Sequence, residues 1–193
     1  MLYVTSYTGS FSSRKKEAAH QHDLSRKLLS FAMEQEYGIP LFSLQIETGK
    51  HGKPHFSNCP VRFSLSHCRG AVCCALSDWE IGVDIQPLRP YDPRLARRIC
   101  TPGELAFLKT ACCPDKALIT LWTLKESLMK LSGLGFAYGF QNAEFAWESG
   151  SFRPARQEIE TATFEPFPDF ILSVCTAGGL PEKVKTVDIS KFS

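Results

Sequence analysis

The first third of the chain combines one alternating segment with one long helical pattern. Residues 2–7 alternate between hydrophobic and polar side chains as a β-strand does, and residues 12–16 are expected to form a polar loop. Hydrophobic residues recur at three- and four-residue steps over residues 17–37, which predicts a helix that ends at Gly38. Residues 48–60 are rich in Gly, Pro and polar groups, and we expect a loop there.

The next segments are short and hydrophobic and are bounded by turn residues, which is typical of β-strands. Strands are predicted over residues 61–66, 70–76 and 81–85, with a turn around His67 between the first two. Because only a short turn separates the last two strands, we expect residues 70–85 to form a β-hairpin.

The second half of the chain begins where Pro87, Pro90 and Pro93 interrupt the pattern and mark a boundary. A short helix is predicted over residues 93–99, and a helix start follows with Thr101 as N-cap, Pro102 at the first position and Glu104 at the third. The clearest helical pattern in this half covers residues 115–131.

The remainder predicts short strands over residues 140–147, 151–155, 161–164 and 170–176. Each half would then hold a helix followed by strands, which indicates an α+β fold with a duplicated layout. We place an N-terminal subdomain at residues 1–86 and a C-terminal subdomain at residues 87–193.

Composition and charge narrow the class of protein. With 193 residues, 44% hydrophobic and 22% charged, the chain is expected to be globular. A formal net charge of +2 argues against a protein that binds nucleic acid along its surface. The apolar run over residues 72–76 is too short to cross a bilayer, and no secretory signal is evident, so no membrane partner is expected.

The chain contains 8 cysteines at irregular spacings. The adjacent pairs Cys73–Cys74 and Cys112–Cys113 fit no zinc-ligand pattern. We expect reduced thiols in a cytoplasmic protein. A disulfide and a zinc or metal-cluster protein are the alternatives.

Two local motifs could bind phosphate. Gly52 would let the backbone approach a ligand closely, and Lys53, followed by Pro54, would supply a mobile positive charge. Ser66 and His67 end a predicted strand and could both donate to a phosphate group. The alternatives are an ordinary solvated loop for the first motif, and a turn serine with a surface histidine for the second.

Two further motifs could hold a metal. Asp84 stands in an apolar predicted strand, and Gln86 lies on the same face two residues later, which suits a hard cation such as Mg²⁺. Glu126 and Lys130 share one face of a helix that is apolar nearly all round. The alternatives are a buried Asp84 bonded to backbone or arginine, and a surface ion pair on the helix.

These motifs occur in a characteristic order between residues 52 and 135: Gly-Lys-Pro, a strand ending Ser-His, Gly-Val-Asp-Ile, Trp-x-x-Lys-Glu-Ser-x-x-Lys and Gly-x-Gly. In this the chain resembles the 4′-phosphopantetheinyl transferases of the Sfp type. A segment with Lys16, Glu17, Ala19 and His20 resembles a phosphate-binding segment of that family less closely.

The resemblance implies two similar α+β subdomains related by pseudo-two-fold symmetry, with coenzyme A in the cleft between them. It implies that Asp84 and Glu126 bind Mg²⁺ and that Lys130 contacts the pyrophosphate. The 3′-phosphate and adenosine end would be held by Lys16, by Gly52, Lys53 and Pro54, and by Ser66 and His67.

The implied reaction joins coenzyme A and a carrier protein. A serine hydroxyl of an apo acyl or peptidyl carrier protein would attack the β-phosphate, take the 4′-phosphopantetheine arm and release 3′,5′-ADP. Glu126 is the candidate base. The resemblance does not identify whether the carrier serves fatty acid, polyketide or nonribosomal peptide synthesis. A monomer is expected, and a binding module for coenzyme A or a nucleotide without catalysis is the competing hypothesis.

One residue departs from the family pattern. Many Sfp-type enzymes have Glu where this chain has Gln86, and an amide oxygen can coordinate a metal but brings no charge. We therefore expect weaker Mg²⁺ affinity and leave open whether Gln86 is a ligand.

Residues 86–115 are the expected docking region for the carrier. Carrier proteins of this kind usually present an acidic helix after the target serine, and this region is rich in arginine, at positions 89, 94, 97 and 98. A helix face that is merely solvated is the alternative.

Overall fold

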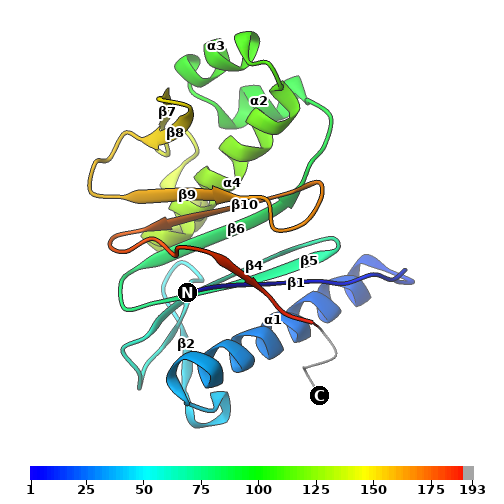
Figure 1. The fold of residues 1–193 in the computed structure, drawn as a ribbon, viewed down its shortest axis with the longest axis vertical. Coiled ribbons are helices and arrows are strands. Elements are labelled where there is room, and N and C mark those ends of the chain that lie inside the picture. Colours follow the sequence, from blue (N-terminus) through cyan, green and yellow to red (C-terminus); the bar gives the residue numbers. More distant parts are fainter. Residues whose placement is uncertain (189–193) are drawn as a thin grey trace.

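A computed structural model describes residues 1–188 of the chain. The N-terminal half begins with a strand, continues through a long helix and ends in a hairpin (Figure 1). Its strands lie side by side in the order β1–β5–β4 and are antiparallel. The elements are β1 (Leu2–Ser6), α1 (Arg14–Tyr37), β4 (Arg62–Cys68) and β5 (Ala71–Ser77).

The C-terminal half repeats this order of elements. A second antiparallel sheet has the order β6–β10–β9, and the long helix α4 comes between its first strand and its hairpin. The elements are β6 (Ile81–Pro87), α4 (Pro114–Ser132), β9 (Glu160–Phe164) and β10 (Phe170–Thr176). Strand, helix and hairpin therefore recur with the same pairing, which confirms the prediction of two similar α+β halves.

Shorter elements complete the fold. The strand β11 adds to the edge of the first sheet in parallel with β1, an addition that the hydrophobic pattern did not predict. The others form two small hairpins, β2–β3 and β7–β8, and short helices that flank α4 or follow α1. Their bounds are η1 (Leu41–Ser43), β2 (Ile46–Thr48), β3 (Pro54–Phe56), α2 (Pro93–Ile99), α3 (Pro102–Thr110), η2 (Gly135–Tyr138), β7 (Phe145–Glu148), β8 (Ser151–Pro154) and β11 (Val184–Thr186).

The predicted hairpin over residues 70–85 is wrong. β5 pairs with β4 and β1, whereas β6 pairs with β10 far along the chain. The hairpin turn lies instead at Arg69–Gly70, where Gly70 has a φ of 91° that favours glycine. The sheets consequently divide before β6, and the proposed subdomain boundary after residue 86 does not follow the hydrogen bonding.

Helix ends show how local chemistry sets the elements. α1 begins three residues earlier than predicted, because the Ser13 side chain accepts a hydrogen bond from the Lys16 backbone N–H and caps the helix. The predicted capping box of Thr101 and Glu104 is confirmed, as are the bounds of α2. The expected loop over residues 48–60 contains β3, and the expected strand over residues 140–147 begins only at Phe145.

The two halves meet where β4 lies beside β6, and within the C-terminal half α4 packs against β6 (Figure 1). The Ser64 hydroxyl accepts a hydrogen bond from the Val83 backbone N–H at 3.1 Å across this junction. At Gly82, a Cβ atom would lie 1.9 Å from the Ser127 carbonyl oxygen and 2.4 Å from the Leu131 nitrogen. Strand and helix can approach this closely only because residue 82 has no side chain.

We expect Gly82→Ala to lower the free energy of unfolding by about 3 kcal/mol, because the methyl group must push α4 away from β6. Urea unfolding followed by circular dichroism measures this. Gly103→Ala in α3 is the matched control, since a Cβ there meets nothing closer than 4.0 Å, and that change should not destabilise the protein. Equal unfolding free energies for the two variants would contradict this account of Gly82.

Candidate active site

The buried carboxylate of Asp84 joins three elements from both halves of the chain. Asp84 lies on β6 and is 3% exposed. Its Oδ1 atom accepts a hydrogen bond from the Ser66 hydroxyl on β4 at 2.6 Å and contacts the Lys130 ammonium on α4 at 2.8 Å. Lys130 also donates to the Val83 carbonyl at 2.9 Å. Burial of this aspartate is therefore compensated by a cation and a hydroxyl.

Glu126 lies one helical turn before Lys130 on α4 and is half-buried. Its burial and, to a smaller extent, the negative charge of Asp84 together raise its pKa from 4.5 to about 7, against the opposing charge of Lys130. The carboxylates of Asp84 on β6 and Glu126 on α4 thus lie close enough to repel each other. A cation that binds between them would relieve this repulsion.

The raised pKa of Glu126 gives stability a pH dependence. The folded protein keeps the proton up to about pH 7, whereas the unfolded chain releases it near 4.5. Without divalent metal, the unfolding free energy should fall as pH rises between these values, by on the order of 1–2 kcal/mol after solvent screening. Denaturant unfolding at a series of pH values measures the slope.

Glu126→Gln should remove that contribution. His67 has the opposite effect on stability. Its pKa is lowered in the folded protein, so the unfolding free energy rises as pH increases through its titration range. This effect is the same in the wild type and in Glu126→Gln, because both contain His67. The difference between wild type and variant isolates Glu126. Identical pH profiles would contradict the assignment.

The remaining oxygens suit a hard cation. The Oδ2 atom of Asp84 makes only a 3.4 Å contact with the Gln86 amide nitrogen, which confirms that both side chains lie on one face of β6. Mg²⁺ commonly takes one or two carboxylates together with substrate phosphates and waters. The carboxylates of Asp84 and Glu126 fit this chemistry, whereas Gln86 presents its amide nitrogen to Asp84 and its amide oxygen to Arg89 at 3.4 Å. Within residues 1–188 there is no group of three or more His, Cys, Asp and Glu side chains that could hold a metal ion.

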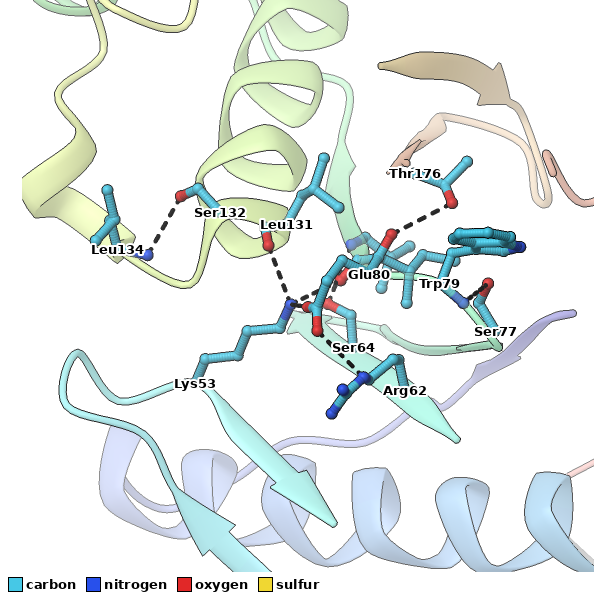
Figure 2. A network of polar contacts seen from close by, with 12 residues as sticks. Lys53, Arg62, Ser64, Ser77, Trp79, Glu80, Leu131, Ser132, Leu134 and Thr176 are labelled. Carbon is cyan, nitrogen blue, oxygen red and sulfur yellow. Dashed lines mark hydrogen bonds and ion pairs between the residues drawn. The ribbon is translucent and has the colours of Figure 1, made fainter. Parts of the chain in front are cut away.

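Lys53 is placed differently from the Asp84 cluster. Figure 2 shows its side chain reaching towards the end of α4 and the turn before β6. Its ammonium contacts Glu80 at 2.7 Å and donates to the carbonyls of Leu131 at 3.1 Å and Ile81 at 3.2 Å. Arg62 makes a second ion pair with Glu80 at 3.2 Å. Lys53 therefore links the β2–β3 hairpin to the start of β6 and the end of α4 in the C-terminal half, a role that its sequence motif did not reveal.

A pocket of about 210 Å³ lies between the Gly52–Pro54 segment and Lys130. Phe63, Ser64 and Leu65 on β4 line it, and Met129 on α4 does so as well. Lys53 also lines a neighbouring pocket of similar size. The two lysines of the motifs thus face one depression at the junction of the halves, which gives an anion access to both charges.

His67 and Lys16 have looser connections to the site. Ser66 and His67 point to opposite faces of β4, so Ser66 is buried against Asp84 while His67 is exposed. Partial desolvation lowers the pKa of His67, and the charges of Lys130 and His22 lower it further. The Lys16 side chain is exposed on the first turn of α1. Their phosphate-binding roles stay predictions.

A buried ion pair supports α4 behind the site, and the sequence pattern did not identify it. Lys125, next to Glu126, is fully buried and contacts the Glu104 carboxylate at 2.8 Å. It also donates to the carbonyls of Phe140 at 3.0 Å and Ala143 at 2.5 Å. The pair connects α4 with α3 and with the segment that leads into β7. The available signal was its spacing, which places Lys125 on the same helix face as Leu121 and Met129.

The predicted docking region is positively charged and exposed. Arg94, Arg97 and Arg98 are exposed on α2, and Arg89 lies at 3.4 Å from the Gln86 side-chain oxygen.

Among the cysteines, which are all free thiols, only Cys112 and Cys113 are exposed. No helix within residues 1–188 has the length and apolar character to cross a membrane.

Comparison with known proteins identifies the class. The model of the 4′-phosphopantetheinyl transferase superfamily matches residues 80–175, which include Asp84, Glu126 and Lys130. The chain belongs to this superfamily and is similar to its Sfp-like members.

Particular relatives make the similarity concrete. The 4′-phosphopantetheinyl transferase psf-1 of Bacillus pumilus is 30% identical over 122 residues, 62% of this chain and 52% of that protein. Sfp of Bacillus subtilis (strain 168) is 25% identical over 186 residues, 92% of this chain and 83% of that protein. A further Bacillus subtilis 4′-phosphopantetheinyl transferase is matched over 56% of its length, so the chain spans about half the length of two of these relatives.

Proposed function

We propose that this protein transfers the 4′-phosphopantetheine arm of coenzyme A to a serine of an apo acyl or peptidyl carrier protein. The contact of Asp84 with Lys130 beside Glu126, at the positions of the family motif, is the observation that carries this proposal. The serine oxygen forms a bond to the β-phosphorus, and the bond from that phosphorus to the bridging oxygen breaks. The serine proton is released, and 3′,5′-ADP leaves.

The residues of the site have distinct roles in this proposal. Lys130 neutralises charge on the pyrophosphate, and Asp84 holds the Lys130 ammonium in place. Glu126, one helical turn before Lys130 on α4, accepts the serine proton. Lys53, Ser66, His67, Lys16 and the Gly52–Pro54 backbone bind the 3′-phosphate and adenosine end.

Asp84 and Glu126, with Gln86 as a neutral third donor, would hold Mg²⁺. When bound, Mg²⁺ supplies positive charge to the pyrophosphate oxygens and lowers the pKa of Glu126. Because Gln86 brings no charge, Gln86→Glu should lower the Mg²⁺ concentration needed for half-maximal activity.

The partner surface and location follow from the same proposal. The exposed arginines on α2 and Arg89 attract an acidic helix of the carrier. Both halves of the site lie in one chain, so a monomer is sufficient for activity. The free thiols suit the reducing cytoplasm, where coenzyme A is available.

The test is to incubate the protein with coenzyme A, Mg²⁺ and a panel of apo-carriers from fatty acid, polyketide and nonribosomal peptide synthesis. Intact mass spectrometry should show one carrier class gaining the mass of one phosphopantetheine arm. Binding of coenzyme A with no mass gain on any carrier would favour the competing function, a binding module without catalysis.

A further inference from the structure

The ammonium of Lys53 has all of its hydrogen-bond donors engaged. An ammonium group carries three N–H donors and no acceptor. It donates to the Glu80 carboxylate at 2.7 Å, and to the carbonyls of Leu131 at 3.1 Å and Ile81 at 3.2 Å (Figure 2). An anion that binds the ammonium of Lys53 must therefore displace one of these three partners.

Lys130 differs from Lys53 in this respect, although both lysines line the same pocket. Within residues 1–188, its partners are the Asp84 carboxylate at 2.8 Å and the Val83 carbonyl at 2.9 Å. These two partners leave one of its three N–H donors for an anion. A phosphate can consequently bind Lys130 directly, whereas binding to Lys53 is a competition.

Glu80 is the partner of Lys53 that can be displaced. The two carbonyls belong to the backbone at the end of α4 and at the start of β6, which the helix and the sheet hold in place. Glu80 lies in the turn before β6, and its side chain is 49% exposed. Water screens an ion pair with so exposed a partner, so this pair is weak and its carboxylate can turn into solvent.

The same carboxylate also neutralises Arg62. One oxygen of Glu80 contacts Lys53 at 2.7 Å and the other contacts Arg62 at 3.2 Å (Figure 2). These three side chains and His55 line the neighbouring pocket of about 210 Å³. A phosphate monoester carries up to about two negative charges at neutral pH, which balances both cations, whereas a carboxylate carries one. Exchange of Glu80 for a phosphate is therefore favoured by charge.

We propose that Glu80 competes with the 3′-phosphate of coenzyme A for Lys53 and thereby sets the preference of the protein for coenzyme A over 3′-dephospho-coenzyme A. This inference rests on the proposed function, which assigns Lys53 to that end of coenzyme A. The Glu80 carboxylate turns into water, and the phosphate takes its place between Lys53 and Arg62. The apparent affinity for coenzyme A is reduced according to the fraction of protein in which Glu80 is already displaced. Dephospho-coenzyme A lacks the displacing group and leaves the ion pair intact.

The experiment compares Glu80→Gln with Asp78→Asn. Glutamine keeps the length of the side chain but has no charge with which to compete for Lys53. Calorimetric titrations with coenzyme A and with dephospho-coenzyme A, both with Mg²⁺ and without carrier, give the two affinities. Glu80→Gln should bind coenzyme A about 5-fold more tightly and dephospho-coenzyme A within about twofold of the wild type. Asp78→Asn removes another exposed carboxylate of the same turn and should bind both ligands as the wild type does.

The outcomes separate the inference from the proposed function. Unchanged or weaker binding of coenzyme A in Glu80→Gln overturns the inference, even if phosphopantetheine transfer occurs. Equal tightening of both ligands assigns Lys53 to the pyrophosphate and also overturns it. Tightening of coenzyme A alone supports the inference even if the wild type transfers nothing to any carrier, a result that would overturn the proposed function only. Failure of both proteins to bind coenzyme A overturns both.

Discussion

Asp84→Asn is expected to lower kcat/KM for phosphopantetheine transfer by about 100- to 1,000-fold. The variant keeps an oxygen that can accept the Ser66 hydrogen bond but removes the negative charge that faces Lys130 at 2.8 Å. It also removes one of the two carboxylates that suit a cation. Steady-state kinetics with coenzyme A, Mg²⁺ and a modified carrier measure the loss.

Asp78→Asn provides the control for this change. Asp78 is an exposed carboxylate in the turn just before β6, and its replacement should leave kcat/KM within about twofold of the wild type. Without divalent metal, loss of the Asp84 charge should also lower the pKa of Glu126, because that charge raises it. Wild-type activity in Asp84→Asn would exclude this residue from the site.

Lys125→Met should lower the free energy of unfolding by about 3–5 kcal/mol, because it leaves the Glu104 carboxylate buried without its cation. Glu104 would keep only its hydrogen bonds from the backbone N–H groups of Thr101 and Phe145. The carbonyls of Phe140 and Ala143 would lose their donor as well. Urea unfolding measures the change.

Two comparisons test this explanation. Lys125→Met combined with Glu104→Gln should recover part of the loss, since the double variant has no buried charge. Lys116→Met removes the partner of Glu165 in an exposed ion pair and should cost less than about 1 kcal/mol. If Lys125→Met cost no more than Lys116→Met, the Lys125–Glu104 pair would not be a structural centre of the second half.

Patterns that depend on near neighbours predicted much of the fold correctly. The helical periodicity before Gly38, the Thr101–Glu104 capping box and the α2 bounds are all local features. The strand pairing could not be predicted in the same way. A hairpin of residues 70–85 was the local expectation, but β6 finds its partner in β10, more than 80 residues later, where burial of both strands decides the pairing.

For the functional site too, the sequence predicted the residues that stand in motifs but not the roles that depend on packing. Asp84, Glu126 and Lys130 stand in recognisable motifs, and their side chains do converge. Lys53 in its Gly-Lys-Pro motif suggested a phosphate ligand, whereas its position between Glu80 and the end of α4 also makes it a structural link. The sequence did not predict the ion pair of Lys125 or the close helix contact at Gly82, because both depend on which elements pack against these residues. A glycine inside a β-branched strand was the one available signal of close approach.

The most direct test counts products of a single reaction. Wild-type protein, coenzyme A and apo-carrier are incubated with and without Mg²⁺, and the carrier's intact mass and the released 3′,5′-ADP are both quantified. The account predicts one 3′,5′-ADP for each phosphopantetheine arm gained, with Mg²⁺ present, and neither product in Asp84→Asn on the same timescale. Carrier modification by Asp84→Asn at the wild-type rate, or 3′,5′-ADP release without carrier modification, would contradict it.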